Sequence, residues 1–240
     1  MLLELSGISK RFGAVIAADA VDLQVADGEA LGIIGANGAG KSSLFNLVTG
    51  VLRADAGTVN FDGRDVTRRS VRERCQAGIG RSFQIPKPFE SLSVFENLLV
   101  AERFGGRGQG DGVAHAAEVL ERTGLLAKAN IVAGKLTLLD RKRLELARAL
   151  ATRPKILLLD EIAGGLTEGE CAELVALIRA LNAEGVTIVW IEHIVHALLS
   201  VVTRLVVLEF GKKIADGEPR AVMASPEVRR SYLGLEEAAA

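Results

Sequence analysis

Four short runs of apolar residues stand out along a chain of otherwise mixed polarity, and they predict buried β-strands. They extend from Leu31 to Ile34, Ile156 to Leu159, Val186 to Ile191 and Leu205 to Leu208. Each run is apolar at nearly every position, which favours a parallel sheet covered on both faces over an alternating antiparallel sheet. Between the second and third runs, apolar residues from Leu174 to Leu181 recur at the spacing of one helix face. This order of strand, helix and strand predicts a βαβ unit and an α/β core.

The beginning and the middle of the chain have different patterns. Three short runs broken by Gly and Asp predict an antiparallel meander, and they cover Glu4 to Lys10, Val21 to Ala26 and Gly57 to Phe61. From about Ser93 to Ala151 the pattern predicts helices. We expect the Gly-rich stretch inside it, Phe104 to Gly112, to be a mobile loop, and the final residues, LEEAAA, to be frayed.

Composition and charge exclude several classes of protein. With 29 Lys and Arg against 30 Asp and Glu in 240 residues, a net charge of −1 gives no long-range attraction to nucleic acid. The basic run from Arg68 to Arg74 has no flanking aromatic residue, so we expect a solvated face and no nucleic-acid partner. Cys75 and Cys171 are too few for a disulfide framework. We expect neither a signal peptide nor a membrane span, because Glu4 interrupts the apolar N-terminus and no window of about 20 residues is free of charge.

The strongest chemical signal is the sequence GANGAGKS from Gly35 to Ser42, which fits the phosphate-loop pattern G-x-x-x-x-G-K-[ST]. It lies between the predicted strand Leu31 to Ile34 and an apolar helix pattern from Leu44 to Val48. Its glycines let the backbone curl so that N–H groups face a phosphate at a helix N-terminus. Lys41 can bridge the β- and γ-phosphates, and Ser42 can offer its hydroxyl to Mg²⁺. We expect the loop to supply these nucleotide-binding residues: Gly35, Asn37, Gly38, Ala39, Gly40, Lys41, Ser42 and Ser43.

Two further predicted strands end in residues suited to catalysis. Asp160 and Glu161 follow one apolar run, and His193 follows another. A carboxylate at the end of a buried strand is costly unless it is paired or binds a metal. We therefore expect Asp160 to contact Mg²⁺, directly or through water, and Glu161 to polarise the attacking water. Because ligands of open α/β sheets bind outside the carboxyl ends of the strands, we expect these signals to form one site.

The order of these motifs resembles that of the ATP-binding-cassette (ABC) ATPases over essentially the whole chain. Gln84, after GRSF, resembles the glutamine of their Q-loop, and LTLLDRKRLELARAL, from Leu136 to Leu150, resembles their signature helix. Phe12 occupies the aromatic position that stacks on adenine in this family, and His193 resembles the switch histidine that contacts the γ-phosphate. The resemblance implies ATP and Mg²⁺ as cofactors, with the metal served by Ser42, Gln84 and Asp160, and γ-phosphate charge stabilised by Lys41 and His193.

The resemblance also implies the fold and the domain organisation. We expect an α/β fold with a P-loop NTPase (RecA-like) core of ABC ATPase type, an N-terminal antiparallel β-subdomain and an inserted helical subdomain. The whole chain, 1–240, would be a single ABC ATPase domain. Residues 1–85 and 155–240 would form the nucleotide-binding core with its β-subdomain, and residues 86–154 the helical signature subdomain.

Within that family, three strings are similar to the ATPase subunits of branched-chain amino acid importers: Arg81 to Ala101, Ile191 to Leu198, and the ending Tyr232-Leu-Gly. This similarity implies permease subunits, a second ATPase subunit and, indirectly, a periplasmic binding protein as partners. It also implies a peripheral location on the cytoplasmic face of the inner membrane. The ATPase of the lipopolysaccharide exporter has the same length and layout, and a soluble or regulatory nucleotide-binding ABC protein is a third alternative. A DNA-repair ABC protein is excluded, because the segment between Lys41 and Asp160 is too short for a coiled-coil insertion.

The chain departs from the family pattern in two places. The usual signature is Leu-Ser-Gly-Gly-Gln, whereas here the sequence from Leu136 to Asp140 is LTLLD. Thr137 keeps the hydroxyl expected to face a partner's nucleotide, but two leucines hinder close approach and Asp140 adds a negative charge near a polyanion. The usual D-loop aspartate is also missing, since Gly164 to Thr167 reads GGLT. Our hypothesis is that the chain's own phosphate loop works normally while its signature is weakened, which suits an asymmetric heterodimer, with a homodimer as the alternative for the isolated chain.

Overall fold

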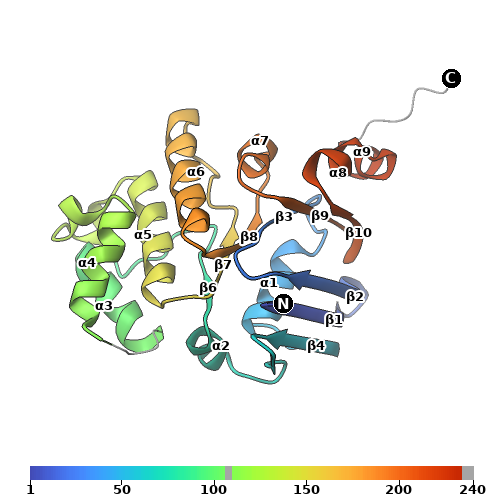
Figure 1. Ribbon diagram of the computed structural model, residues 1–240, viewed down its shortest axis with the longest axis horizontal. Coiled ribbons are helices and arrows are strands. Elements are labelled where there is room, and N and C mark those ends of the chain that lie inside the picture. Colours follow the sequence, from blue (N-terminus) through green and yellow to red (C-terminus); the bar gives the residue numbers. More distant parts are fainter. Residues whose placement is uncertain (106–109, 234–240) are drawn as a thin grey trace. The chain divides into compact units, whose positions relative to one another are not determined.

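The computed structural model describes residues 1–105 and 110–233 (Figure 1). Contacts divide the chain into two compact units. The first unit contains Met1–Ser70 and the chain from Val189 onward, and the second contains Val71–Ile188. No helix within the described ranges is both long and apolar enough to cross a membrane.

The N-terminal part of the first unit is an antiparallel sheet. It has the strand order β2-β1-β4-β5 and is formed by β1 (Leu3–Phe12), β2 (Val15–Val25), β4 (Ala56–Phe61) and β5 (Arg64–Asp65). Leu3, Leu5 and Leu23 are buried, so alternate positions of these strands supply the core. The sheet confirms the antiparallel pairing predicted for this part of the chain.

The rest of the first unit contains the parallel strands on which the phosphate loop depends. Strand β3 (Ala30–Ile34) pairs in parallel with β9 (Arg204–Glu209), and β10 (Lys212–Gly217) joins β9 in antiparallel orientation. All five residues of β3 are buried. Four helices complete the described part of this unit: α1 (Lys41–Thr49), α7 (Val195–Leu199), α8 (Pro219–Ala224) and α9 (Pro226–Leu233).

The second unit combines a short parallel pair of strands with several helices. Strand β6 (Ile79–Arg81) pairs with β7 (Ile156–Asp160). Helices α3, α4 and α5 pack on one another (Figure 1). The helices are α2 (Val71–Ala77), α3 (Val94–Gly105), α4 (Gly112–Arg122), α5 (Leu138–Ala151) and α6 (Glu168–Ala183), with short 3₁₀ turns at Leu126–Lys128 and Ala133–Lys135. Strand β8 (Thr187–Ile191) spans the boundary between the two units, and the chain order β7, α6, β8 is the one predicted.

Two expectations from the sequence need correction. The Gly-rich stretch from Phe104 to Gly112 is not a loop at its ends, because Phe104 belongs to α3 and Gly112 begins α4. Asp111 makes this helix start possible, since its carboxylate accepts hydrogen bonds from the N–H groups of Val113 and Ala114. Residues 106–109 and the LEEAAA ending lie outside the described residues. The basic run is not wholly solvated either, because Arg74 is buried on α2.

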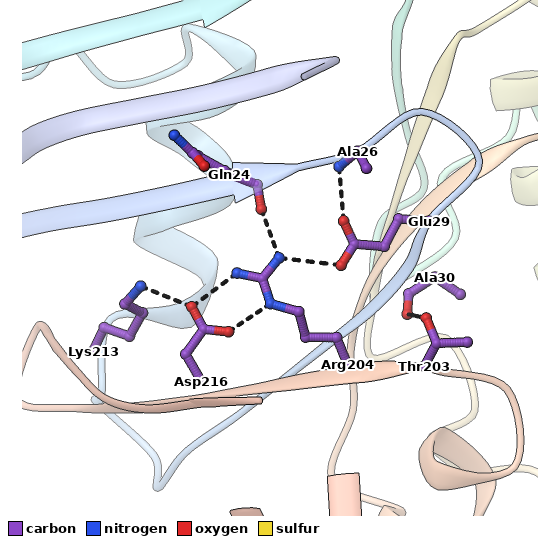
Figure 2. Close-up of polar contacts among 8 residues, drawn as sticks. All are labelled: Gln24, Ala26, Glu29, Ala30, Thr203, Arg204, Lys213 and Asp216. Carbon is purple, nitrogen blue, oxygen red and sulfur yellow. Dashed lines mark hydrogen bonds and ion pairs between the residues drawn. The ribbon is translucent and has the colours of Figure 1, made fainter. Parts of the chain in front are cut away.

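Arg204 links β9 to its neighbours through a network of charged side chains (Figure 2). Its Nε and Nη2 atoms donate to the two carboxylate oxygens of Asp216 on β10 at 2.6 and 2.9 Å. Its Nη1 atom donates to the carbonyl of Gln24 at 3.0 Å and to Glu29 at 3.2 Å. Lys213 adds a second cation on Asp216 at 2.8 Å. Burial alone would raise the pKa of Asp216, but the hydrogen bonds from Arg204 and Lys213 outweigh it and lower this pKa below its ordinary value.

We expect Asp216→Asn to lower the free energy of unfolding at neutral pH by roughly 2 kcal/mol, because it breaks a bidentate, charge-assisted contact. A carboxylate with a lowered pKa stabilises the fold above its unfolded-state pKa, and this contribution is lost as the pH falls through the lowered value. The difference from wild type should therefore shrink in acid. Urea unfolding at a series of pH values measures it, with the exposed Glu121→Gln as the charge-matched control. A loss of stability that stays constant down to the acid limit would contradict the ionic origin.

Candidate functional site

The turn between β3 and α1 has the backbone shape of a phosphate loop. Gly38 and Gly40 have φ angles of 82° and 103°, in the left-handed region that favours glycine. A Cβ atom at Gly40 would lie 2.3 Å from the carbonyl oxygen of Ala17, and one at Gly35 would lie 2.2 Å from that of Leu208. Larger residues therefore cannot replace these two glycines without moving the backbone. Helix α1 starts directly after Gly40, so its N-terminal N–H groups are at the loop.

Backbone hydrogen bonds hold this loop from the neighbouring strands. The N–H of Gly211, in the turn between β9 and β10, donates to the carbonyl of Ala39 at 3.0 Å. The carbonyl of Gly211 in turn accepts from the N–H of Asp19 at 2.9 Å. The sequence analysis did not single out Gly211. The signal that could have found it is a glycine shortly after the predicted strand Leu205 to Leu208. In the structure the φ angle of Gly211 is 79°.

Lys41 is placed within the curl of the loop. Its side chain is buried, and its ammonium donates to the carbonyls of Gly35 at 2.7 Å and Ala36 at 3.0 Å. Asn37, Gly38 and Ser42 are exposed on the same turn. A fixed ammonium beside convergent N–H groups is the arrangement that binds phosphate oxygens. This part of the predicted site is therefore preorganised within the first unit.

Phe12 and His193 also lie in the first unit, and both are accessible. Phe12 ends β1, is 48% exposed and has the Lys10 ammonium 5.4 Å from its ring centroid. An exposed flat ring of this kind can stack on a nucleobase. His193 follows β8 and is exposed, while its backbone N–H donates to the carboxylate of the buried Glu192 at 3.0 Å. Glu192 thus orients the backbone that presents His193.

The two predicted acidic residues lie in the second unit, and each contacts a side chain from the segment Arg81 to Gln84, which begins at the last residue of β6. Asp160 ends β7 and is nearly buried, and its Oδ2 atom accepts from Arg81 Nη2 at 2.6 Å. The amide nitrogen of Gln84 donates to Glu161 Oε2 at 2.6 Å. Glu161 has a φ of 47°, a left-handed conformation that is rare for a glutamate and that often marks functional positions. The structure therefore brings Gln84 to Glu161 and adds Arg81, which the sequence analysis did not assign to the site.

The residues predicted to serve Mg²⁺ have the oxygen donors that this ion takes when it is bound together with a nucleotide. In the part of the chain that the structure describes, no cluster of three or more His, Cys, Asp or Glu side chains could hold a metal by itself. Mg²⁺ at nucleotide sites commonly takes only one or two protein oxygens and completes its shell with phosphates and water. Within the second unit, the carboxylate of Asp160 and the amide oxygen of Gln84 are hard donors of that type, and within the first unit the hydroxyl of Ser42 is another.

The signature segment differs from the expectation in its electrostatics. Asp140 is nearly buried, and its carboxylate pairs with the Lys128 ammonium at 2.5 Å and accepts from the Thr137 hydroxyl at 2.9 Å. Thr137 is also the N-cap of α5, because its hydroxyl oxygen accepts from the N–H of Asp140. Lys128 balances the negative charge of Asp140 locally, which reduces the repulsion that this carboxylate would exert on a nearby phosphate. Leu138 is 44% exposed whereas Leu139 is buried, so only one of the two leucines lies on the surface of the segment.

Comparison with known proteins agrees with this arrangement of motifs. The model of the family described as ABC transporter matches residues 18–164, and that of the Branched-chain amino acid ATP-binding cassette transporter matches residues 212–238. The high-affinity branched-chain amino acid transport ATP-binding protein BraF of Pseudomonas aeruginosa is 36% identical, with 97% of this chain and 98% of the relative covered. The corresponding protein LivG of Escherichia coli (strain K12) is also 36% identical, with the same coverage.

Solved structures show the same fold. A nucleotide-free ATP-binding cassette from an ABC transporter superposes with a TM-score of 0.88 at 32% identity, with 98% of this chain and 99% of that chain covered. A cassette in its ADP conformation superposes with a TM-score of 0.89 at 34% identity and the same coverage. A dimeric cassette bound to ADP and Pi has a TM-score of 0.81 at 26% identity, with 91% and 99% covered. The chain therefore belongs to the ABC transporter family, as an ATP-binding cassette with the α/β fold of these ATPases.

Proposed function

We propose that this chain is the ATP-hydrolysing subunit of an ABC importer for branched-chain or related amino acids. The observation that carries the proposal is the match of residues 212–238 to the branched-chain amino acid cassette family, beyond the part shared by ABC transporters in general. Relatives named as branched-chain amino acid transport ATP-binding proteins also align over nearly the whole chain. A lipopolysaccharide-type exporter and a regulatory nucleotide-binding protein are outcomes of the test below.

In this proposal the phosphate loop from Gly35 to Ser43 binds the phosphates of ATP, and Phe12 stacks on the adenine. Lys41 and His193 stabilise the charge of the γ-phosphate. The exposed ring of Phe12 and the buried ammonium of Lys41 support these two roles. When Mg²⁺ is bound through Ser42, Gln84 and Asp160, it neutralises phosphate charge.

Glu161 orients the attacking water and takes its proton. The water oxygen bonds to the γ-phosphorus, the bond to the bridging oxygen breaks, and ADP leaves with that electron pair. Gln84, whose amide holds the Glu161 carboxylate at 2.6 Å, keeps one carboxylate oxygen in a fixed position. Thr137 faces the nucleotide of a second cassette, as the resemblance of its segment to the ABC signature implies.

The proposal extends to domains, partners and location. Residues 1–85 and 155–240 form the nucleotide-binding core with its β-subdomain, and residues 86–154 form the helical signature subdomain. The chain works as a peripheral subunit on the cytoplasmic face of the inner membrane, where ATP is available. It binds transmembrane permease subunits and a second ATPase subunit, with a periplasmic binding protein acting indirectly. The altered signature LTLLD favours a heterodimer over a homodimer.

Co-purification of the tagged chain from its native membrane tests the proposal. We expect mass spectrometry to find two permeases, a second ATPase and a periplasmic binding protein that carries a branched-chain or related amino acid. A second tagged transporter from the same membrane is the control for detergent damage. Recovery of lipopolysaccharide-export components, or of no membrane protein while the control transporter stays intact, would contradict the importer assignment.

A further inference from the structure

We propose that Arg81 is a positioning residue that competes with Mg²⁺ for the carboxylate of Asp160. The inference rests on the proposed function in one respect, which is that Asp160 serves Mg²⁺. Arg81 lies in the strings GRSF and Arg81 to Ala101, but the family resemblance assigns it no role.

Arg81 and Asp160 form a nearly buried ion pair. Arg81 Nη2 lies 2.6 Å from Asp160 Oδ2, and both side chains are only 8% exposed. In such a place the guanidinium supplies the positive charge that the carboxylate needs. A divalent cation that approaches the same carboxylate repels the guanidinium. Mg²⁺ and Arg81 therefore compete for Asp160.

Arg81 lies at the point where the chain leaves a strand. It is the last residue of β6, and the N–H of Ser82 still donates to the carbonyl of Leu158 on β7 at 2.9 Å. Beyond Ser82 the described backbone leaves the strand, and Phe83 and Gln84 are exposed. The Arg81 side chain thus ties the start of an exposed segment to the end of β7.

The segment that begins at Arg81 contacts both Asp160 and its neighbour Glu161. Gln84 holds Glu161 at 2.6 Å, so one segment of four residues, Arg81 to Gln84, contacts both acidic residues through its two ends. The guanidinium of Arg81 also lies 4.9 Å from the ring centroid of Phe83. That cation–π contact does not depend on Asp160 and can retain the side chain once the carboxylate is taken. Metal binding at Asp160 is thereby coupled to the segment that orients Glu161.

Mn²⁺ binding followed by electron paramagnetic resonance tests this competition without using hydrolysis. The protein is kept in excess over ADP so that the nucleotide is bound, and Mn²⁺ is titrated in. We expect Arg81→Gln to tighten Mn²⁺ binding by roughly tenfold, because the metal no longer displaces a buried ion pair. Arg81→Lys keeps a positive charge but lacks the planar fork, so we expect a smaller tightening, of about threefold.

Arg153→Gln is the matched control. Arg153 pairs with the nearly buried Glu102 at 2.9 Å in the same unit, so its replacement also breaks an arginine–carboxylate pair and removes the same unit of charge. We expect this variant to lose stability while its Mn²⁺ affinity stays within a factor of two of wild type. Thermal unfolding of each variant separates a loss of stability from a change in metal affinity.

The possible outcomes separate the inference from the proposed function. Unchanged or weaker Mn²⁺ binding in Arg81→Gln would overturn the role of Arg81. If that variant does not fold, Arg81→Lys is the deciding variant. A Mn²⁺ affinity of Arg81→Lys equal to that of wild type would then overturn the role of Arg81. Asp160→Asn tests the underlying assignment, because Mn²⁺ affinity unchanged in that variant would remove Asp160 from the metal site whatever Arg81 does.

Discussion

Replacement of Glu161 by glutamine is expected to leave ATP binding intact while it slows hydrolysis by roughly 10²–10⁴-fold, the contribution of a positioned general base. Glutamine has the size of glutamate and can keep a hydrogen bond with Gln84, but it cannot accept the proton of the attacking water. The left-handed φ of 47° at Glu161 indicates that the surrounding fold holds this residue at a conformational cost. Nothing in that backbone conformation distinguishes glutamine from glutamate, so the effect should fall on chemistry and not on folding.

Two measurements on the same preparation check this expectation. Equilibrium binding of ATP should agree with wild type within a factor of a few, and single-turnover release of phosphate should show the decrease in rate. Glu168→Gln, an exposed acid at the start of α6, is the matched control and should hydrolyse ATP at the wild-type rate. Unaltered turnover in Glu161→Gln would remove Glu161 from the role of base.

Lys41→Ala should have the second-largest effect, a loss of ATP affinity of roughly 100-fold, since it removes a charge-assisted contact to phosphate. The Lys41 ammonium already has a fixed position, because it donates to the carbonyls of Gly35 and Ala36 within the loop. Alanine leaves those two carbonyls, in the loop that binds the phosphates, without their cation. Like partial charges then oppose binding, in addition to the lost attraction.

Calorimetric titration of ATP into the purified variant measures this loss. Arg68→Ala, which removes an exposed cation from the same unit, is the control and should bind ATP as wild type does. A variant whose affinity stays within threefold of wild type would show that the convergent N–H groups of the loop carry phosphate binding by themselves.

The strands of the parallel sheet that could be predicted were those with an apolar residue at nearly every position. The runs containing Ile33 and Leu158 are apolar throughout because both faces of their strands are covered, and the structure confirms them as β3 and β7. Strands β6 and β10 were not predicted. Strand β6 has only three residues, and β10 has the polar sequence KKIADG with no buried position, so neither has a hydrophobic pattern of its own.

Charged residues were harder to place than apolar ones. Asp140 was expected to add a negative charge near a phosphate, and its pairing with Lys128, twelve residues away in the chain, was not predicted. Arg74 was expected to be solvated, yet it is buried. Burial of a charged side chain depends on a partner that neutralises it, and the sequence does not reveal which of many opposite charges will be adjacent.

The sequence by itself determined the phosphate loop, since its pattern of glycines and lysine acts over eight neighbouring residues and needs no distant partner. It also determined the α/β class, through the period of its apolar positions. Only the tertiary structure decided how the acidic residues are held. Arg81 and Asp160 are 79 positions apart and meet because β6 and β7 pair in parallel. A hydrogen bond requires contact within about 3 Å, and that proximity is a property of the folded chain.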